Sequence, residues 1–182
     1  MKRVLVPLAP GFEEIEAITI IDILRRSGAR VSIAGIVEGV IEGSRGIKII
    51  ADESIDKINT EKFDLIVLHG GQPGTKNLDN DPRITALLKK MGEQNKLIAA
   101  ICAAPIILKK RGLLKEKKRT SHPSVKEELS GEYYVEERVV VDHNIITSRS
   151  PGTAMEFSFK LVEILYGKDR AKLINKGILA NI

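Results

Sequence analysis

Leu97-Ile98-Ala99-Ala100-Ile101-Cys102-Ala103-Ala104-Pro105 is the stretch of this 182-residue sequence that decides its fold. Residues 97–101 are all apolar and predict a short, buried strand, and residues 103–110 predict a helix. Small residues at positions 100 and 104 flank the cysteine, as a tight strand-to-helix turn requires. The stretch therefore predicts an α/β fold in which Cys102 occupies a nucleophile elbow beyond the end of a strand.

Cys102 is the only cysteine of the chain. The backbone amides and the dipole of a following helix favour negative charge, so we expect them to lower the pKa of the thiol and raise its reactivity. The alternative is a small apolar side chain that fills a gap in the core. The elbow favours the nucleophile.

Strands and helices alternate along the rest of the chain. Predicted strands span residues 2–8, 30–35, 64–68, 133–141 and 144–148, a hairpin or bent ribbon spans 37–50, and helices span 13–27, 81–94, 153–166 and 169–178. Apolar strands in such an order imply a mainly parallel sheet that is covered on both faces. No linker or repeat interrupts the pattern, so we expect one domain over residues 1–182. Its site should lie where the turns at 10–16, 69–74, 102–104 and 148–153 converge.

Composition excludes several function classes. A single cysteine forms no internal disulfide, which indicates a reducing compartment, and no apolar stretch approaches the roughly 18 residues of a membrane span. We expect a cytoplasmic protein with no membrane partner. The net charge of +5 comes largely from residues 109–111 and 115–119. These basic residues could bind phosphate, but we expect them to be solvated lysines that follow a helix. With 4% aromatic residues, a nucleic-acid partner is not expected. No residues have metal-ligand spacing, so neither a metal nor a cofactor is expected.

Glu16 is the candidate acid. On a helix it falls between Ile20 and Ile23, in an apolar sector that faces the sheet. A carboxyl group held there is desolvated, so its pKa is raised, and in its protonated form it can donate a hydrogen bond to the sulfur. Glu13 and Glu14 also lie in the first turn, and we expect both to be solvated.

Two further segments carry polar chemistry. Gly70-Gly71, with Gly74 shortly after, forms a glycine-rich turn whose amides can bind an anion or a developing oxyanion. His122 precedes a proline in a loop and is either a proton carrier near the elbow or an ordinary loop residue. His69 and His143 have weaker claims to a role.

Five segments together resemble the ThiJ/PfpI family, in its DJ-one-like branch, which is named for a parkinsonism-associated protein deglycase. They are residues 9–16 (APGFEEIE), 70–74 (GGQPG), 99–105 (AAICAAP), 120–123 (TSHP) and 147–153 (TSRSPGT). The resemblance implies a flavodoxin-like three-layer sandwich that forms a homodimer through its first helix and nearby strands.

The resemblance also implies roles for particular residues. Cys102 would be the nucleophile, Glu16 the protonated acid and His122 the catalytic histidine. Gly70, Gly71 and Ala103 would line the oxyanion and substrate pocket, and Arg45 of the hairpin would face it. Arg26 matches a second basic residue at the dimer contact. Two departures matter: Ala103 stands where the peptidase branch has histidine, and His69 stands where close members often have proline.

Two classes of function follow. As an enzyme, the protein would convert methylglyoxal or a related 2-oxoaldehyde to a hydroxy acid without glutathione, or remove early glyoxal adducts from proteins or nucleotides. As a redox sensor or chaperone in the oxidative stress response, it would act through oxidation of Cys102. An intracellular cysteine peptidase is the weaker alternative, because of Ala103.

Overall fold

A seven-stranded sheet lies at the centre of the computed structural model, which describes residues 1–182. In spatial order its strands are β5 (Glu53–Ser54), β2 (Arg30–Gly35), β1 (Arg3–Leu8), β6 (Leu65–Leu68), β7 (Leu97–Ile101), β9 (Ile145–Ser148) and β8 (Val139–Asp142). All neighbouring strands are parallel except the edge strand β8, which runs antiparallel to β9. The predicted α/β fold with a mainly parallel sheet is confirmed.

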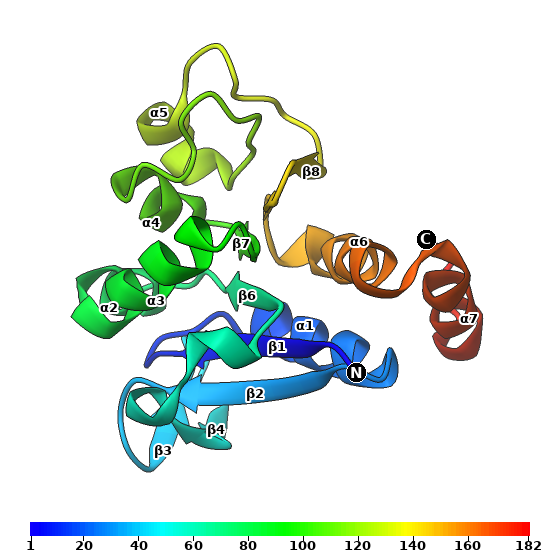
Figure 1. Cartoon of the computed structure of the whole chain (residues 1–182), viewed down its shortest axis with the longest axis horizontal. Helices are drawn as coiled ribbons and strands as arrows, with labels where there is room; N and C mark the ends of the chain where they lie inside the picture. The colour runs from blue at the N-terminus through cyan, green and yellow to red at the C-terminus, as the bar shows by residue number, and fades with distance from the viewer.

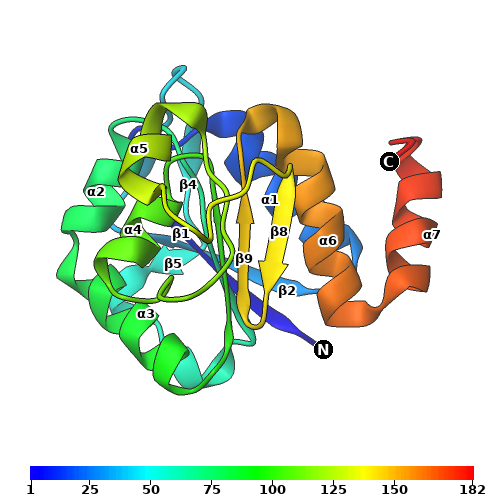
Figure 2. The ribbon, with the colours of Figure 1, turned by 90° about the horizontal axis from the view of Figure 1, so that it is seen from above.

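Helices cover both faces of the sheet, so the chain has three layers (Figure 2). One face carries α1 (Glu14–Arg26) and α6 (Ala154–Tyr166), and the other carries α2 (Gly74–Asn80), α3 (Pro82–Glu93), α4 (Pro105–Lys110) and α5 (Lys126–Leu129). The last helix, α7 (Lys168–Ile178), packs on the outer side of α6, away from the sheet (Figure 1). No helix is both long enough and apolar enough to cross a membrane.

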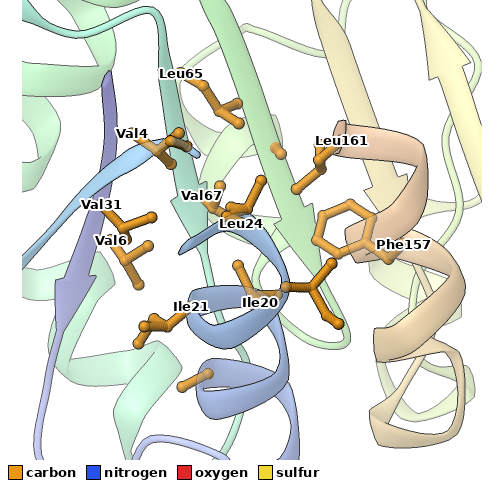
Figure 3. Close-up of a cluster of buried hydrophobic side chains, with 14 of the residues drawn as sticks. Val4, Val6, Ile20, Ile21, Leu24, Val31, Leu65, Val67, Phe157 and Leu161 are labelled. Carbon is orange, nitrogen blue, oxygen red and sulfur yellow. The ribbon is translucent and has the colours of Figure 1, made fainter. Parts of the chain in front are cut away.

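The core under α1 and α6 explains how α1 is fixed against the sheet. Branched side chains of three strands face α1, where Ile20, Ile21 and Leu24 pack against them, and α6 adds Phe157 and Leu161 (Figure 3). The strand residues labelled in Figure 3 are Val4, Val6, Val31, Leu65 and Val67. Each fully buried side chain of this size stabilises the fold by about 1.5–3 kcal/mol. The helix is thereby held rigidly against the sheet.

Most predicted elements are observed within one or two residues, and the bent ribbon is a hairpin of β3 (Val40–Glu42) and β4 (Lys48–Ile50). The other short elements are the 3₁₀ turns η1 (Ile55–Lys57), η2 (Thr60–Lys62), η3 (Pro123–Val125) and η4 (Pro151–Thr153).

Two predicted boundaries were wrong. The strand predicted over 133–141 begins only at Val139, because residues 133–138 have no strand beside them and make a single bridge between Tyr134 and Arg119. The helix predicted from residue 103 begins at Pro105, because Ala103 and Ala104 form the turn. The short helix α2 was missed, because its sequence GTKNLDN has no apolar period.

Candidate active site

Cys102 lies in the turn between β7 and α4, in a backbone conformation that non-glycine residues rarely adopt. Its φ is +65°, and such a conformation costs about 1–3 kcal/mol and persists only where the surroundings enforce it. The enforcement is visible in two hydrogen bonds. The N–H of Cys102 donates to the carbonyl oxygen of Ser148 at 3.0 Å, and the N–H of His122 donates to the carbonyl oxygen of Cys102 at 2.8 Å. The turn therefore holds the side chain at the carboxyl end of the sheet.

Glu16 is fully buried in the first turn of α1 and reaches the same place. Glu13 caps the helix and accepts a hydrogen bond from the N–H of Glu16 at 2.7 Å. One carboxyl oxygen of Glu16, Oε2, accepts a hydrogen bond from the N–H of Gly70 at 2.7 Å. The other, Oε1, is buried without a well-aligned partner, and the carboxyl group adjoins the Cys102 thiol. Burial raises the pKa of Glu16 to about 7, against the lowering effects of Cys102 and Gly70.

Gly70 separates the acid from the sulfur and leaves room for no side chain. A Cβ atom there would lie 2.6 Å from Cβ of Cys102, 2.8 Å from Oε2 of Glu16 and 3.0 Å from Sγ of Cys102. Only glycine permits these groups to meet this closely. The amide of Gly70 is committed to Glu16, whereas the amides of Gly71 and Ala103 face the sulfur. The amides of Gly71 and Ala103 are thus the donors that remain available to an oxyanion.

The ionisation of Cys102 differs from the sequence-based expectation. Burial raises the pKa of the thiol, and the negative charge of Glu16 and its hydrogen bond raise it further, against the lowering effect of the amides of Ala103 and Gly71. Burial acts whatever the protonation state of Glu16, whereas the charge of Glu16 acts only when Glu16 is ionised, so the two groups titrate as a coupled pair. The expectation considered only the amides and the helix dipole.

His122 and Arg45 lie at the margin of the site. The main chain of His122 is tied to Cys102, but Nδ1 of its imidazole is 2.7 Å from the hydroxyl of Ser124. Arg45 is exposed at the hairpin turn, where its guanidinium contacts the carbonyl oxygen of Ser44 and its charge partly opposes the rise in the pKa of Glu13 that burial causes. The structure gives neither side chain a contact with the sulfur or with Glu16.

The expectation that Glu13 and Glu14 are solvated was wrong. Glu13 is half-buried, and burial raises its pKa. Glu14 is buried, and its carboxylate accepts hydrogen bonds from the N–H of Arg45 at 2.5 Å and the hydroxyl of Ser44 at 3.0 Å. Hydrogen bonds of this kind lower the pKa of Glu14 despite its burial. Both residues anchor loops beside Glu16, which the acidic first-turn pattern alone did not indicate.

His69, which had only a weak claim to a role on the sequence alone, is fully buried beside the glycine-rich turn. Its Nδ1 lies 2.7 Å from the carbonyl oxygen of Gly70. Burial lowers its pKa to about 4, so the imidazole is neutral at physiological pH.

One sizeable pocket of the molecule lies away from the elbow. A pocket of about 710 Å³ lies between α6, α7 and residues 136–139, and none of its lining residues belongs to the elbow, the glycine turn or the start of α1. Its walls carry paired charges, such as Arg138 with Glu156. The chemistry therefore places the candidate site at Cys102 and not at this pocket. No cluster of three or more His, Cys, Asp or Glu side chains is arranged to hold a metal ion.

Comparison with known proteins agrees with this geometry. Residues 2–164 match the DJ-1/PfpI family. The chain is 46% identical to Protein DJ-1 homolog A of Arabidopsis thaliana over 97% of its own length, but it spans only 46% of that relative. It is 36% identical to the glutathione-independent glyoxalase DJR-1.2 of Caenorhabditis elegans, covering 97% of this chain and 96% of the relative.

A solved structure shows the same fold. The structure described as oxidized Toxoplasma gondii DJ-1 superposes with a TM-score of 0.95 and is 41% identical in sequence, covering 98% of both chains. A family match over most of the chain, together with relatives above 30% identity, confirms the resemblance found in the sequence motifs. The chain belongs to the DJ-1/PfpI family.

Proposed function

We propose that this protein is a cysteine-dependent enzyme that converts small 2-oxoaldehydes, such as methylglyoxal, to 2-hydroxy acids without glutathione. The observation that carries the proposal is the contact between the Cys102 thiol and a carboxyl group, Glu16, whose pKa is raised to about 7 by burial. Such a group exchanges protons readily at neutral pH. The C. elegans relative described as a glutathione-independent glyoxalase supports the choice of reaction.

The first step requires a thiolate. Two amides, those of Gly71 and Ala103, face the sulfur, whereas one, that of Gly70, donates to Glu16. The reaction requires the form of the pair that carries one proton, on Glu16, and the negative charge on sulfur, and the two amides stabilise that form. The thiolate attacks the aldehyde carbon, and the carbonyl oxygen takes the charge between the two amides. Glu16 then protonates that oxygen, which gives a hemithioacetal.

The remaining steps are an internal redox change and a hydrolysis. A base, Glu16 or His122, removes the proton from the former aldehyde carbon to give an enediol, and a proton returns to the adjacent carbon. The aldehyde carbon is thereby oxidised to a thioester and the ketone carbon is reduced to an alcohol, so no external oxidant is needed. Water cleaves the thioester and releases the hydroxy acid and the free thiol. Removal of early glyoxal adducts from proteins or nucleotides would begin with the same attack by Cys102.

The decisive experiment is a steady-state assay of lactate formation from methylglyoxal in the absence of glutathione. Cys102→Ser is the matched control, because it preserves the size of the side chain but not the thiolate. Lactate formed by the wild-type chain and not by Cys102→Ser supports the proposal. Equal background rates in both would contradict it.

A second candidate is redox sensing through the same sulfur. The Toxoplasma gondii neighbour is described as oxidized, and the only cysteine of this chain has no thiol partner with which to form an internal disulfide. A redox role or a chaperone role would then follow the oxidation state of Cys102. A peptidase reading has less support, because Ala103 follows the nucleophile where the peptidase branch has histidine.

We further propose that residues 1–182 form one domain and that two copies associate in a reducing compartment such as the cytoplasm. The continuous seven-stranded sheet supports a single domain. Association of two copies is supported by exposed apolar side chains on the outer face of α1 and on the hairpin, which are Ile15, Ile18, Val40 and Ile50. Arg26 is exposed and paired with Asp22 of its own helix. Ile18→Asp is expected to convert a dimer to monomers in light scattering, and an unchanged mass would count against this contact.

A further inference from the structure

The peptide group between Gly70 and Gly71 is held from behind by a buried histidine. Nδ1 of His69 lies 2.7 Å from the carbonyl oxygen of Gly70. A carbonyl oxygen only accepts hydrogen bonds, so Nδ1 carries the proton and donates it. The N–H of Glu13 donates to the same oxygen at 3.0 Å. Two donors from different segments therefore fix the direction of this carbonyl.

Fixing the carbonyl of Gly70 also fixes the amide of Gly71. The two belong to one planar peptide group, in which the C=O and the N–H point in opposite directions. The Gly71 amide faces the sulfur of Cys102. The φ of Gly71 is +93°, and a Cβ there would lie 2.4 Å from the N atom of Glu13. The turn is thus packed directly against the segment that supplies the second donor.

We propose that His69 is a positioning residue for the oxyanion pocket, which aims the Gly71 amide at Cys102 by holding the carbonyl oxygen of Gly70. The expected effect of His69 on turnover rests on the proposed function. The expected effect of His69 on the reactivity of the Cys102 thiol does not involve a substrate. The His69 side chain makes no hydrogen bond to the sulfur or to Glu16, and in this proposal it acts through the peptide group that it holds.

A packing role alone explains the histidine poorly. His69 lies edge-on to Phe12, with the ring centres 6.0 Å apart, and an apolar side chain would fill that space equally well. Its second ring nitrogen, Nε2, is buried without a well-aligned hydrogen bond, although the carbonyl oxygen of Pro7 lies near the ring. A buried polar atom without a partner destabilises a fold by about 1–3 kcal/mol. An imidazole at this position is therefore costly unless the bond made by Nδ1 has a use.

Three variants test the proposal in the full-length chain. His69→Asn places an amide donor close to the position of Nδ1, His69→Gln places one close to that of Nε2, and His69→Leu provides none. The readouts are kcat and KM with methylglyoxal, the pH dependence of Cys102 alkylation by iodoacetamide, and Tm. Loss of a correctly aimed oxyanion donor lowers kcat by a factor of about 100 or more in other enzymes, so misaiming one is expected to lower it at least about tenfold.

We expect His69→Leu and His69→Gln to lower kcat with little change in KM and to shift the alkylation profile to higher pH, because the thiolate loses the Gly71 amide. His69→Asn is expected to restore both properties toward wild type. Equal behaviour of Asn and Gln, or a wild-type alkylation profile in His69→Leu, would overturn the proposal, and a change in Tm alone would indicate packing. If the wild-type chain does not turn over methylglyoxal, the proposed function fails, whereas the alkylation comparison still decides the role of His69.

Discussion

The carboxyl group of Glu16 and the main chain of Gly70 are joined by a hydrogen bond of 2.7 Å, although the two residues are 54 positions apart. The bond links the first turn of α1 to the loop after β6. The next amide, that of Gly71, faces the Cys102 sulfur. One dipeptide therefore contacts both the acid and the nucleophile, and the geometry of the pair depends on this loop.

A side chain at position 70 is expected to abolish the activity. In Gly70→Ala the new Cβ would lie 2.6 Å from Cβ of Cys102, so the loop and the elbow must move apart. A displacement of about 1 Å in an active site can lower the rate about a hundredfold. We expect a loss of at least that size in turnover of methylglyoxal, together with slower alkylation of Cys102.

The matched control for Gly70→Ala is Gly177→Ala. Gly177 lies in α7, and a Cβ there meets nothing within 4 Å. Alanine in a helix is favoured over glycine by about 1 kcal/mol, so this variant should be as active as wild type and slightly more stable. Normal turnover in Gly70→Ala would show that the close approach has no catalytic purpose.

Glu16→Gln is expected to reduce turnover by about a hundredfold or more, because the amide retains a hydrogen-bond donor but has no proton to exchange. The measurement is kcat with methylglyoxal at pH 7. Glu132→Gln, at an exposed position, is the control and should be silent. Glu13→Gln is not a suitable control, because Glu13 caps α1 through the N–H of Glu16. If Glu16→Gln retains normal turnover, the role of Glu16 is structural only.

The same substitution should change how stability depends on pH. The pKa of Glu16 is raised in the folded chain from 4.5 to about 7, so between these values the unfolded chain has lost a proton that the folded chain retains. The free energy of unfolding therefore falls as pH rises through this window, by about 3 kcal/mol. Glutamine does not titrate. Urea denaturation at pH 4.5 and pH 8 should show that Glu16→Gln gains stability relative to wild type at the higher pH, and a constant difference would contradict the raised pKa.

The sheet and the elbow were predictable from sequence because they rest on local patterns. Apolar runs identify the parallel strands, and the small residues around Cys102 indicate its turn. The apolar sector of α1 likewise located Glu16 correctly, because a helix buries the whole of one face.

Contacts between distant loops were not predictable in this way. The burial of Glu14 depends on a hairpin turn 31 positions away, and acidic residues in a first turn are usually solvated. The raised pKa of Cys102 depends on burial and on a neighbouring acid, neither of which the elbow motif reveals. The motif correctly indicated where the sulfur lies, but its ionisation is a property of the pair.

Alkylation of Cys102 tests where the shared proton resides. If the first proton lost from the pair leaves the sulfur, the rate of labelling by iodoacetamide should rise with an apparent pKa of about 7 or lower, below the roughly 8.5 of a free thiol. Intact mass spectrometry at a series of pH values gives this rate. An apparent pKa above that of a free thiol would place the first charge on Glu16 and leave Cys102 as a packing residue.

Graded oxidation distinguishes the sensor from a purely enzymatic role. A sulfenate usually proceeds to a disulfide, but the chain has no second thiol, so further oxidation to the sulfinate is expected. The amides of Gly71 and Ala103 favour an anion at this position, and a protonated Glu16 can donate a further hydrogen bond to it. Under mild peroxide, intact-mass spectrometry should therefore show a dominant gain of two oxygen atoms on Cys102, absent in Cys102→Ser. Direct passage to three oxygen atoms, or oxidation confined to the three methionines, would contradict the sensor and leave the carbonyl enzyme as the better account.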